Sequence, residues 1–470
     1  MRLGNYSYAK YSTDANLFYS ELSDKAFVLS QCVVVLKIIT ASIHKMSTNQ
    51  PLAYQTSKAV LLYLNANLRL ELAQKCSEIR TADMSTPLKI ENLQLSPMDF
   101  QVNDTTYGVT LHRVPRRTEY FPEYPHDNSN CEEIYDVDHY GFKDQSVGPE
   151  DSFFWDYVAF SYDYESDLDI VLKKHSLTHA DLSESAEKIR SDISLSKKPD
   201  MSKLQFLFDR NNQVLFPYIL RHMGMEPHEM PYYYCIGFNV NDGEKTELVD
   251  YTCKLVDAVR YMFNKVFGNR KLIIAKKLEI SAFCCFRYKF QSHFIVSDLK
   301  ISDDYSKVLN EFGPLLNSNE QQTLQSLQIV VPEGNNGLDH AIIKSAEVLT
   351  VEGDLSNEQL QQLSTTNRRV IFDDDEYQDE ILFLVGEWKR NTPPIGTHYS
   401  FPLFDDHFHY AFDDIRQLEG SSERLYPETR ETKFPHCITF KLSNESELNV
   451  YYEQEYIHMK IDPAGHSVPL

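Results

Sequence analysis

The sequence is poor in basic residues relative to acidic ones. Its 470 residues include 46 Lys and Arg against 69 Asp and Glu, which gives a formal net charge of −23. Proteins that bind nucleic acid usually neutralise phosphates with Lys and Arg, and this contribution supplies much of their affinity. The composition therefore argues against a nucleic-acid partner. The 42% of hydrophobic residues indicates a globular chain, and its length predicts two or three domains.

The charges are distributed unevenly. Between Glu119 and Asp169 there are fifteen acidic residues and one basic residue, whereas Lys254–Lys289 holds nine basic and two acidic residues. Two interpretations remain open: the two segments are solvated faces that attract each other within the fold, or the basic segment docks an acidic partner.

The sequence also lacks paired cysteines. None of the eight cysteines stands in a Cys-x-x-Cys pair, and their spacing is unlike the dense framework of a small secreted domain. We therefore expect reduced, mostly buried thiols in a cytoplasmic or nuclear protein.

The common catalytic and nucleotide-binding motifs are missing as well, including the glycine-rich phosphate loops, His-Glu-x-x-His and Gly-x-Ser-x-Gly. One segment, Asp405-Asp406-His407-Phe408-His409, resembles a metal site if His407 and His409 share one face of a strand. The favoured interpretation is an acidic loop before a helix that starts near Tyr410. We predict no catalysis, no bound metal and no cofactor, and keep a metal-dependent enzyme at His407 and His409 as the less favoured alternative.

Only one hydrophobic run approaches the length of a membrane span. It covers Ala26–Ile43, but Lys37 and several polar residues interrupt it. A lysine near the centre of a span costs about 2.5–3.5 kcal/mol, which argues against a membrane segment. The status of residues 1–45 as part of the working protein stays open.

A short strand motif is repeated five times in the second half of the chain. The steps between the first residues of successive copies are 21, 28, 22 and 21 residues, the copies being Leu278-Glu-Ile280, Leu299-Lys-Ile301, Leu327-Gln-Ile329, Leu349-Thr-Val351 and Val370-Ile-Phe372. This period is typical of leucine-rich-type repeats, in which each unit buries its apolar face only by stacking on a neighbour. The repeats predict a stack of short strands that lie side by side and serve as a binding scaffold.

Other segments show clear periodicities. Pro51–Ala82 predicts two short amphipathic helices with a break near Asn65–Asn67, and a strand meander follows between Leu88 and Leu111. Further predicted elements are a strand at Tyr232–Val240, a helix from Leu255 to Val266 that ends at Gly268, helices between the repeats (Tyr305–Leu316, Leu338–Ser345, Asn357–Leu363 and Tyr377–Trp388), and capping strands at Cys437–Leu442 and Leu448–Ile461.

Several blocks together resemble a known family. Leu248–Ile280 resembles the hallmark segment of a nematode-expanded, uncharacterised domain family associated with F-box proteins, and Pro51–Leu95 resembles the degenerate F-box-like opening of that group. Tyr135–Phe142 is similar to a short acidic Asp-x-Asp-x-Tyr-Gly signature between them. Ala346–Trp388 and the strand pair Ile438–Ile461 resemble an F-box-associated C-terminal region.

The resemblance implies a target-recognition adaptor of a cullin-type ubiquitin ligase. The helical box would bind a Skp1-like linker protein, and the repeat region would select an unknown protein target. The apolar residues positioned for linker contact are Leu52, Val60, Leu61, Leu64 and Leu68, although they equally suit a local core. The box departs from a consensus F-box in lacking its Leu-Pro opening and its late Trp. A ligase-independent binding protein is therefore the main alternative.

Together these observations predict an α+β fold with a small helical F-box-like N-terminal module, a strand-rich middle and a leucine-rich-repeat-like α/β stack at the C-terminus. The expected divisions are an extension (1–45), F-box-like helices and strand meander (46–112), an acidic aromatic insertion and helix (113–200), the uncharacterised family domain entering the repeats (201–335), and the F-box-associated repeat region with capping strands (336–470).

Overall fold

The computed structural model divides into two compact units, Met1–Pro87 and Leu88–Leu470. The residues that the structure describes are 50–116, 130–131, 136–142, 180, 183, 187, 216–228, 230, 232–241, 245–268, 270–281, 288, 290–316, 324–332, 337–373, 378–402, 408–427, 436–443, 445–453 and 455–469.

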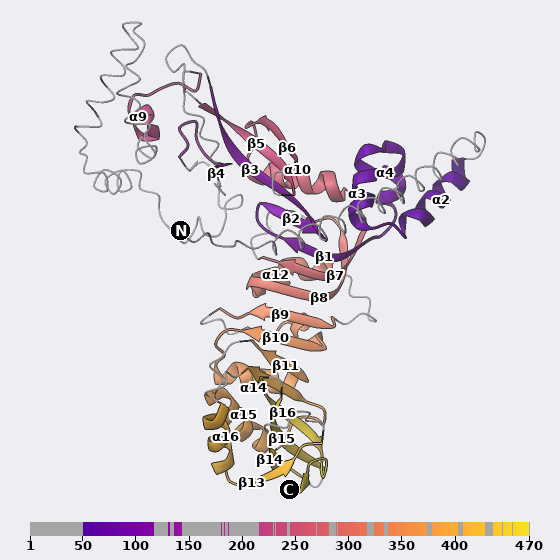
Figure 1. The fold of residues 1–470 in the computed structure, drawn as a ribbon, viewed down its shortest axis with the longest axis vertical. Coiled ribbons are helices and arrows are strands. Elements are labelled where there is room, and N and C mark those ends of the chain that lie inside the picture. The colour runs from indigo at the N-terminus through magenta and orange to yellow at the C-terminus, as the bar shows by residue number, and fades with distance from the viewer. Residues whose placement is uncertain are drawn as a thin grey trace, which may run out of the picture. The chain divides into compact units, whose positions relative to one another are not determined.

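Three short helices make up the described part of the first unit: α2 (Gln50–Leu61), α3 (Ala66–Lys75) and α4 (Ser77–Met84) (Figure 1). The predicted break near Asn65 is confirmed, because the Asn65 side chain caps α3 by accepting a hydrogen bond from the Asn67 N–H at 2.8 Å. A further break at Cys76 was not predicted. The helices enclose a small core of Leu61, Ile79 and Ala82.

A buried ion pair connects α3 to the end of α4. The Arg69 Nη2 and Asp83 Oδ1 atoms are 2.8 Å apart, and the two side chains are 2% and 0% exposed. Arg69 also donates hydrogen bonds to the carbonyl oxygens of Pro87 at 2.8 Å and Thr86 at 3.1 Å. A buried guanidinium is tolerated only with such partners, so Arg69 fixes both the helix pair and the segment that leaves it.

The described strands of the second unit join in one mixed sheet of 17 strands. Its first part is the predicted meander of β1 (Leu88–Leu95), β2 (Asp99–Val102) and β3 (Thr105–Pro115), which is confirmed. The β2–β3 turn places Asn103 at φ 53°, a conformation that Asn tolerates better than most residues.

This antiparallel part continues on the far side of β3. There β3 pairs with β5 (Tyr232–Val240), which pairs with β6 (Lys245–Asp250). The two-residue strand β4 (Asn130–Cys131) also pairs with β3. The strand predicted at Tyr232–Val240 has the observed limits of β5.

On its other side β1 starts a block of parallel strands, each hydrogen-bonded to the next, which comprises β7 (Leu272–Ile280), β8 (His293–Asp304), β9 (Ser326–Val330), β10 (Val348–Glu352), β11 (Arg369–Phe372) and β12 (His398–Pro402). The five repeated motifs lie side by side in β7 to β11, as predicted. Their first residues are successive Cα partners, and the row extends at its two ends into β1 and β12: Leu93, Leu278, Leu299, Leu327, Leu349, Val370 and Tyr399.

We call these seven residues the buried ladder. None of them is more than 2% exposed. Because the side chains of a strand alternate between its faces, the partners two positions later, from Leu95 in β1 to Phe401 in β12, are buried on the same face. The flank of each strand is therefore covered by its neighbours.

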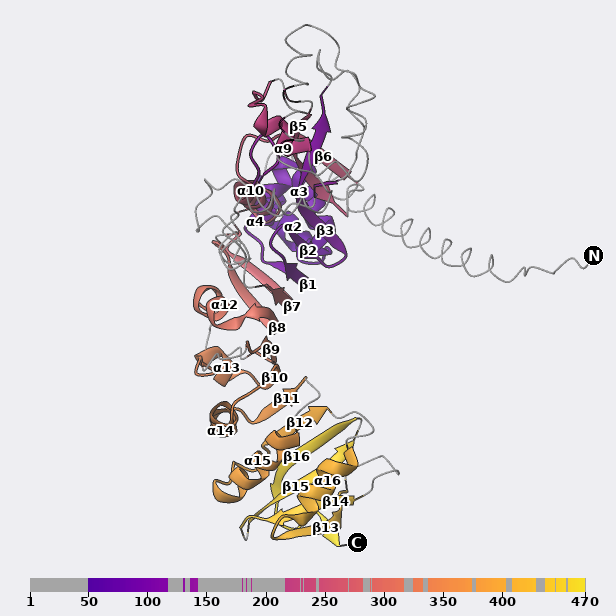
Figure 2. The same ribbon diagram turned by 90° about the vertical axis from the view of Figure 1, so that its left-hand side faces the viewer.

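Helices follow the parallel strands along the chain: α12 (Tyr305–Phe312) with the 3₁₀ turn η1 (Gly313–Leu315), α13 (Ala341–Ser345), α14 (Asn357–Thr366), α15 (Gln378–Arg390) and α16 (Phe408–Gln417). α12 and α13 lie within the predicted ranges, whereas α14 and α15 begin within theirs and end at Thr366 and Arg390, beyond the predicted Leu363 and Trp388. Figure 2 shows α12, α13, α14 and α15 on one side of the strands that they connect. A capping box starts α14, because Ser356 accepts from the Gln359 N–H while the Gln359 side chain accepts from the Ser356 N–H.

The tail strands attach to the last parallel strand, as the prediction of capping strands requires. β16 (Tyr456–Pro463) pairs antiparallel with β12, and β15 (Ser446–Glu453), β14 (His436–Lys441), β13 (Ser421–Leu425) and β17 (Val468–Pro469) follow in that order.

The helix α10 (Leu255–Phe267) packs on β3 and β5, and its predicted end is confirmed by Gly268 at φ 60°. Its apolar stripe meets an aromatic cluster around Phe263, whose ring centroid lies 5.4 Å from that of Phe100 and 4.8 Å from that of Tyr288. The aromatic cluster anchors the antiparallel strands near the start of the parallel block. The helix α9 (Phe216–His222) precedes β5 in the chain.

The α+β class is confirmed, but the units differ from the five predicted divisions. The chain divides at residue 87 rather than 112, because β1 to β3 belong to the large sheet and not to the helical module. The expected boundaries at 200 and 335 lie within the second unit, since hydrogen-bonded strands cross them. The hydrophobic run 26–43 and most of the acidic segment 119–169 lie outside the described residues. In the part of the chain that is described, no helix has the length and apolar character needed to cross a membrane.

Candidate functional site

The parallel block presents one face that its own helices do not cover. We call it the open face; it consists of the residues that alternate with the buried ladder, and its central row is Gln94, Glu279, Lys300, Gln328, Thr350, Ile371 and Ser400. All of these except Ser400 are exposed or half-buried. Figure 2 shows no described helix on this side of β8 to β11. The face is therefore a regular array of side chains on a rigid sheet.

Weak contacts between side chains of neighbouring strands connect the residues of the open face. The Lys300 Nζ atom lies 3.7 Å from Glu279 Oε1, and Ser302 Oγ donates to the same oxygen at 3.4 Å. Further along, Gln328 Nε2 donates to Asp373 Oδ2 at 3.3 Å. Such partly exposed pairs contribute about 0.2–1 kcal/mol each, so a partner can replace them at little cost.

A pair of histidines lies where β12 meets β16. The His398 Nε2 and His458 Nδ1 atoms are 3.1 Å apart, Ser400 Oγ lies 2.9 Å from His458 Nδ1, and His458 Nε2 lies 3.1 Å from the Glu453 carbonyl oxygen. Because a carbonyl oxygen only accepts, His458 Nε2 carries the hydrogen and Nδ1 is the acceptor. Burial, followed by the neighbouring His458, lowers the pKa of His398 to about 4, and burial also lowers the pKa of His458. Both rings are therefore neutral at pH 7.

A buried polar network supports the strands beside these histidines. Asp462 accepts hydrogen bonds from the Tyr426 hydroxyl at 2.9 Å and from Asn449 Nδ2 at 3.1 Å. Burial alone would raise the pKa of Glu447, but hydrogen bonds from the Ser467 and Gly465 N–H groups hold it below its ordinary value. Each of these groups is satisfied within the protein, so the network fixes the capping strands.

The second candidate site depends on the Asp-x-Asp-x-Tyr-Gly segment that the sequence singled out. Asp136 is buried and accepts hydrogen bonds from the Tyr251 hydroxyl at 2.6 Å and from the Leu255 N–H at the start of α10, at 2.8 Å. Asp138 Oδ1 accepts from the N–H groups of Tyr140 and Phe142, both at 2.9 Å. The two carboxylates therefore have structural roles: one caps α10, and the other closes a tight turn.

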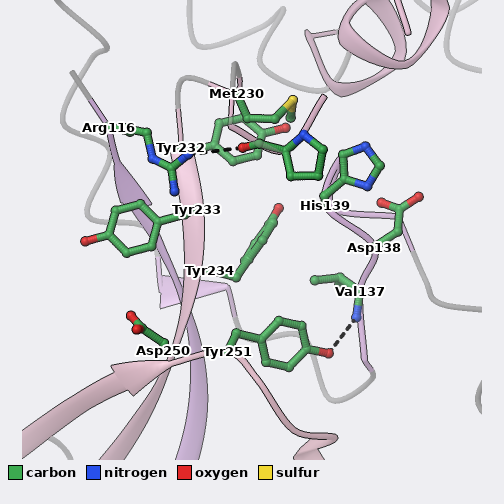
Figure 3. A pocket seen from close by; sticks show the side chains of 11 residues that line it. Arg116, Val137, Asp138, His139, Met230, Tyr232, Tyr233, Tyr234, Asp250 and Tyr251 are labelled. Carbon is green, nitrogen blue, oxygen red and sulfur yellow. Dashed lines mark hydrogen bonds between the residues drawn. The ribbon is translucent and has the colours of Figure 1, made fainter. Parts of the chain in front are cut away.

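This turn borders a cavity of about 640 Å³ that is rich in tyrosine (Figure 3). The walls come from the end of β3, the 136–142 turn, the segment after α9, and the adjoining ends of β5 and β6, and they consist of Arg116, Val137, Asp138, His139, Pro227, Met230, Tyr232, Tyr233, Tyr234, Asp250 and Tyr251. The volume is in the range of small-molecule and side-chain pockets.

The residues expected to contact a linker protein have different positions in the first unit. Leu61 is 3% exposed and belongs to the local core, against which Leu64 packs. Val60 and Leu68 are half-buried, and the side chain of Leu52 lies outside the described residues. The local-core interpretation therefore describes Leu61 and Leu64. The large exposed side chains beside them, Leu62 at 44% and Tyr63 at 91% exposed, were not singled out from the sequence.

Of the two interpretations of the segment around His407 and His409, the helix that starts near Tyr410 is confirmed and the strand is wrong. α16 begins at Phe408, so His409 is helical, and a two-residue spacing does not place side chains on one face of a helix. The residues 405–407 lie outside the described part of the chain. Among the described residues there is no group of three or more His, Cys, Asp and Glu side chains that could hold a metal ion.

Sequence reasoning missed the cavity and both ends of the parallel block. The cavity brings together residues more than a hundred positions apart, for which no local pattern exists. A signal for β1 was present, because Leu93-Gln-Leu95 has the same form as Leu278-Glu-Ile280, but it stands 185 residues upstream (278 − 93) of that copy.

Comparison with protein families matches residues 254–405 to a domain of unknown function, DUF3557. The matched segment covers α10 and the strands β7 to β12, whereas the residues that line the cavity precede it. Searches of curated proteins and of solved structures found no significant match.

Proposed function

We propose that the protein is a recognition scaffold that binds another protein through the open face of its parallel strands. The observation that carries this proposal is the in-register row from Leu93 to Tyr399, which leaves the opposite side chains of β1 and of β7 to β11 facing away from the core. We interpret the block as a leucine-rich-repeat-like stack, in which neighbouring units share one core and display one surface.

The chemistry of the open face suits a polypeptide partner. Its side chains are short polar groups, both signs of charge and a few apolar groups such as Val348 and Ile371. They stand on hydrogen-bonded strands, so little backbone entropy is lost when a partner binds. A mixture of charges at fixed spacing favours specificity and a fast encounter over tight binding of one small molecule.

Asn367 illustrates how the stack keeps this face rigid. It lies three residues before Val370 and is 3% exposed, and its Nδ2 donates to the Ile343 carbonyl oxygen at 2.8 Å. The amide thus joins α13 to the residue that ends α14, and it satisfies a buried acceptor. Successive units are therefore connected by side chains as well as by the ladder.

The test is affinity purification of the full chain, followed by binding measurements with each candidate partner. Lys277 and Arg369 are exposed on the open face, and the double substitution Lys277→Glu/Arg369→Glu should reduce partner affinity at least tenfold. The matched control is Lys307→Glu on α12, which is exposed on the helical side and should leave the affinity unchanged. Equal loss in the control, or no loss in the double variant, contradicts this assignment.

A finer proposal adds the role of a ubiquitin-ligase adaptor. It is supported by the resemblance of Pro51–Leu95 to an F-box-like segment and by the separate helical unit, where Leu62 and Tyr63 are exposed at the end of α2. Exposed apolar residues of this kind favour a helix-to-helix contact.

The adaptor proposal is tested by co-purification of the full chain with a Skp1-like protein. Leu62→Glu/Tyr63→Glu should abolish the interaction, whereas the exposed Lys75→Glu on α3 should not. If the wild-type chain never retains a Skp1-like protein, the ligase-independent scaffold is the better description.

A further inference from the structure

We propose that the tyrosine-rich cavity binds a cationic group, an alkyl guanidinium or ammonium such as the side chain of Arg or Lys in a partner. The lining residues all lie between Arg116 and Tyr251, so this site is distinct from the open face and does not depend on it.

The cavity is held open by hydrogen bonds within its own walls. The Tyr232 hydroxyl donates to the Tyr140 carbonyl oxygen at 2.8 Å, and the Tyr140 hydroxyl donates to the Met225 carbonyl oxygen at 3.0 Å. The Tyr251 hydroxyl donates to Asp136 and accepts from the Val137 N–H at 3.2 Å. The walls are therefore preformed, and a ligand need not order them.

These hydrogen bonds determine which parts of the tyrosine side chains can contact a ligand. The hydroxyl groups of Tyr232 and Tyr251 have partners in the wall, so these residues line the cavity mainly through their rings. In Figure 3 the ring of Tyr234 lies between the rings of Tyr232 and Tyr251. The face of a phenol ring carries negative electrostatic potential and attracts cations.

Arginine side chains of the protein already contact aromatic rings at or near the cavity. The Arg116 guanidinium lies 5.1 Å from the centroid of Tyr233, Arg113 lies 5.4 Å from that of Tyr232, and Arg221 lies 5.3 Å from that of Phe142. Tyr232 and Tyr233 line the cavity, and each has an arginine beside its ring. Contacts between guanidinium groups and aromatic rings therefore already occur at this cluster.

The charges of the lining favour a cation further. Asp138 and Asp250 line the cavity, against Arg116 as the single lining residue that is always cationic. Arg116 donates to the carbonyl oxygens of Pro227 at 3.1 Å and His228 at 3.5 Å, so its donors are directed into the wall. Asp250 is exposed at the end of β6 and forms no ion pair with another described residue. The Arg221 Nη1 atom lies 4.0 Å from Asp138 Oδ2, so Asp138 already has a cationic neighbour. An incoming cation therefore meets ring faces and the exposed Asp250 carboxylate.

The experiment titrates the full chain with small probes by calorimetry. Butylguanidinium tests a free guanidinium compound, and a capped Gly-Arg-Gly tripeptide tests a guanidinium that belongs to a peptide. Choline tests a quaternary ammonium ion, and inorganic phosphate tests an anion. We expect dissociation constants on the order of millimolar for the cations, weakening as salt is raised. Tighter binding of the tripeptide than of butylguanidinium identifies a peptide ligand, and equal binding identifies a free amine or guanidine.

Three substitutions connect binding to the cavity. Asp250→Asn and Tyr234→Leu should each weaken cation binding about three- to thirtyfold, whereas Tyr234→Phe keeps the ring and should preserve it. Asp354→Asn, an exposed carboxylate elsewhere, is the matched control. Melting temperatures verify folding, and if Tyr234→Leu unfolds, Asp250→Asn decides. The proposal is overturned if no cationic probe binds at a concentration ten times the expected dissociation constant. It is also overturned by binding that is indifferent to Asp250→Asn and Tyr234→Leu, or by preferential binding of phosphate that is lost in Arg116→Gln.

Discussion

Leu93 and Leu278 are Cα partners in adjacent parallel strands, although 185 residues (278 − 93) separate them in the chain. The intervening segment forms the antiparallel strands, α10 and the walls of the cavity before it returns to β7. The pairing makes β1 the first member of the parallel block, so the buried ladder is one strand longer at that end than the repeats alone predict. It also connects the antiparallel strands and the parallel block into one sheet.

The ladder should dominate the stability of the second unit. Leu327 is fully buried in β9, and Leu327→Ala should lower the free energy of unfolding by about 2–5 kcal/mol, since a cavity replaces packed methyl groups. Chemical denaturation followed by circular dichroism measures this change. The next residue, Gln328, points to the open face, and Gln328→Ala should lower stability by no more than about 1 kcal/mol, the contribution of its contact with Asp373. Similar losses for both variants contradict the assignment of the two faces.

The turn beside the cavity requires a glycine at position 141. Gly141 has φ 97°, and a Cβ atom there would collide with the Tyr234 hydroxyl. Gly141→Ala should therefore destabilise the protein by about 2 kcal/mol or more and weaken binding in the cavity. Gly396→Ala is the matched control, because Gly396 has φ 91° but an added Cβ would have no neighbour within 4 Å. The difference between the melting temperatures of the two variants measures the destabilisation caused by the collision with Tyr234. Equal melting temperatures show that the Tyr234 side chain moves aside.

The buried ion pair should hold the helical unit together. Arg69→Met leaves Asp83 as an unpaired buried charge, which should destabilise the unit by about 3–5 kcal/mol. Hydrogen exchange of the α3 and α4 amides in the full chain measures this change separately from the large sheet. Arg69→Met/Asp83→Leu removes both charges and should recover much of the loss. A single variant with unchanged exchange shows that the pair does not stabilise the helices.

The histidine pair should make stability depend on pH. The pKa of His398 falls from 6.5 to about 4 in the folded protein, so the unfolded chain binds this proton more readily. The contribution is fully present above pH 6.5 and declines as pH falls toward 4, by up to about 3 kcal/mol at 1.4 kcal/mol per pKa unit. Unfolding free energies measured between pH 7.5 and 4 test this expectation. His398→Gln should flatten the profile in that window, whereas His139→Gln, an exposed position, should not.

Much of the fold could be predicted because its signals are local. The spacing of Leu255, Val259 and Met262 indicates one helical stripe, and a stop at Gly268 follows from its freedom to adopt positive φ. The repeated Leu-x-Ile form indicates strands whose alternate residues are buried, and a period near 21 residues implies that copies stack. For the same reason the helices between the copies were expected in nearly their observed positions.

Other features have no local signal. Leu61 and Leu62 are equally apolar, but only the packing of α2 on α4 determines that the first is buried and the second exposed. The cavity likewise depends on pairings such as β3 with β5, which no window of the sequence contains.

Helices and strands could be placed from local periodicity, because periods of two and of about three and a half residues follow from backbone geometry within a few residues. Contacts between distant segments have no such signal; examples are β1 beside β7, Asp136 at the start of α10, and Tyr234 against Gly141. They arise because buried strands must be paired and buried polar groups must be satisfied, and both requirements are met only when the whole chain has folded.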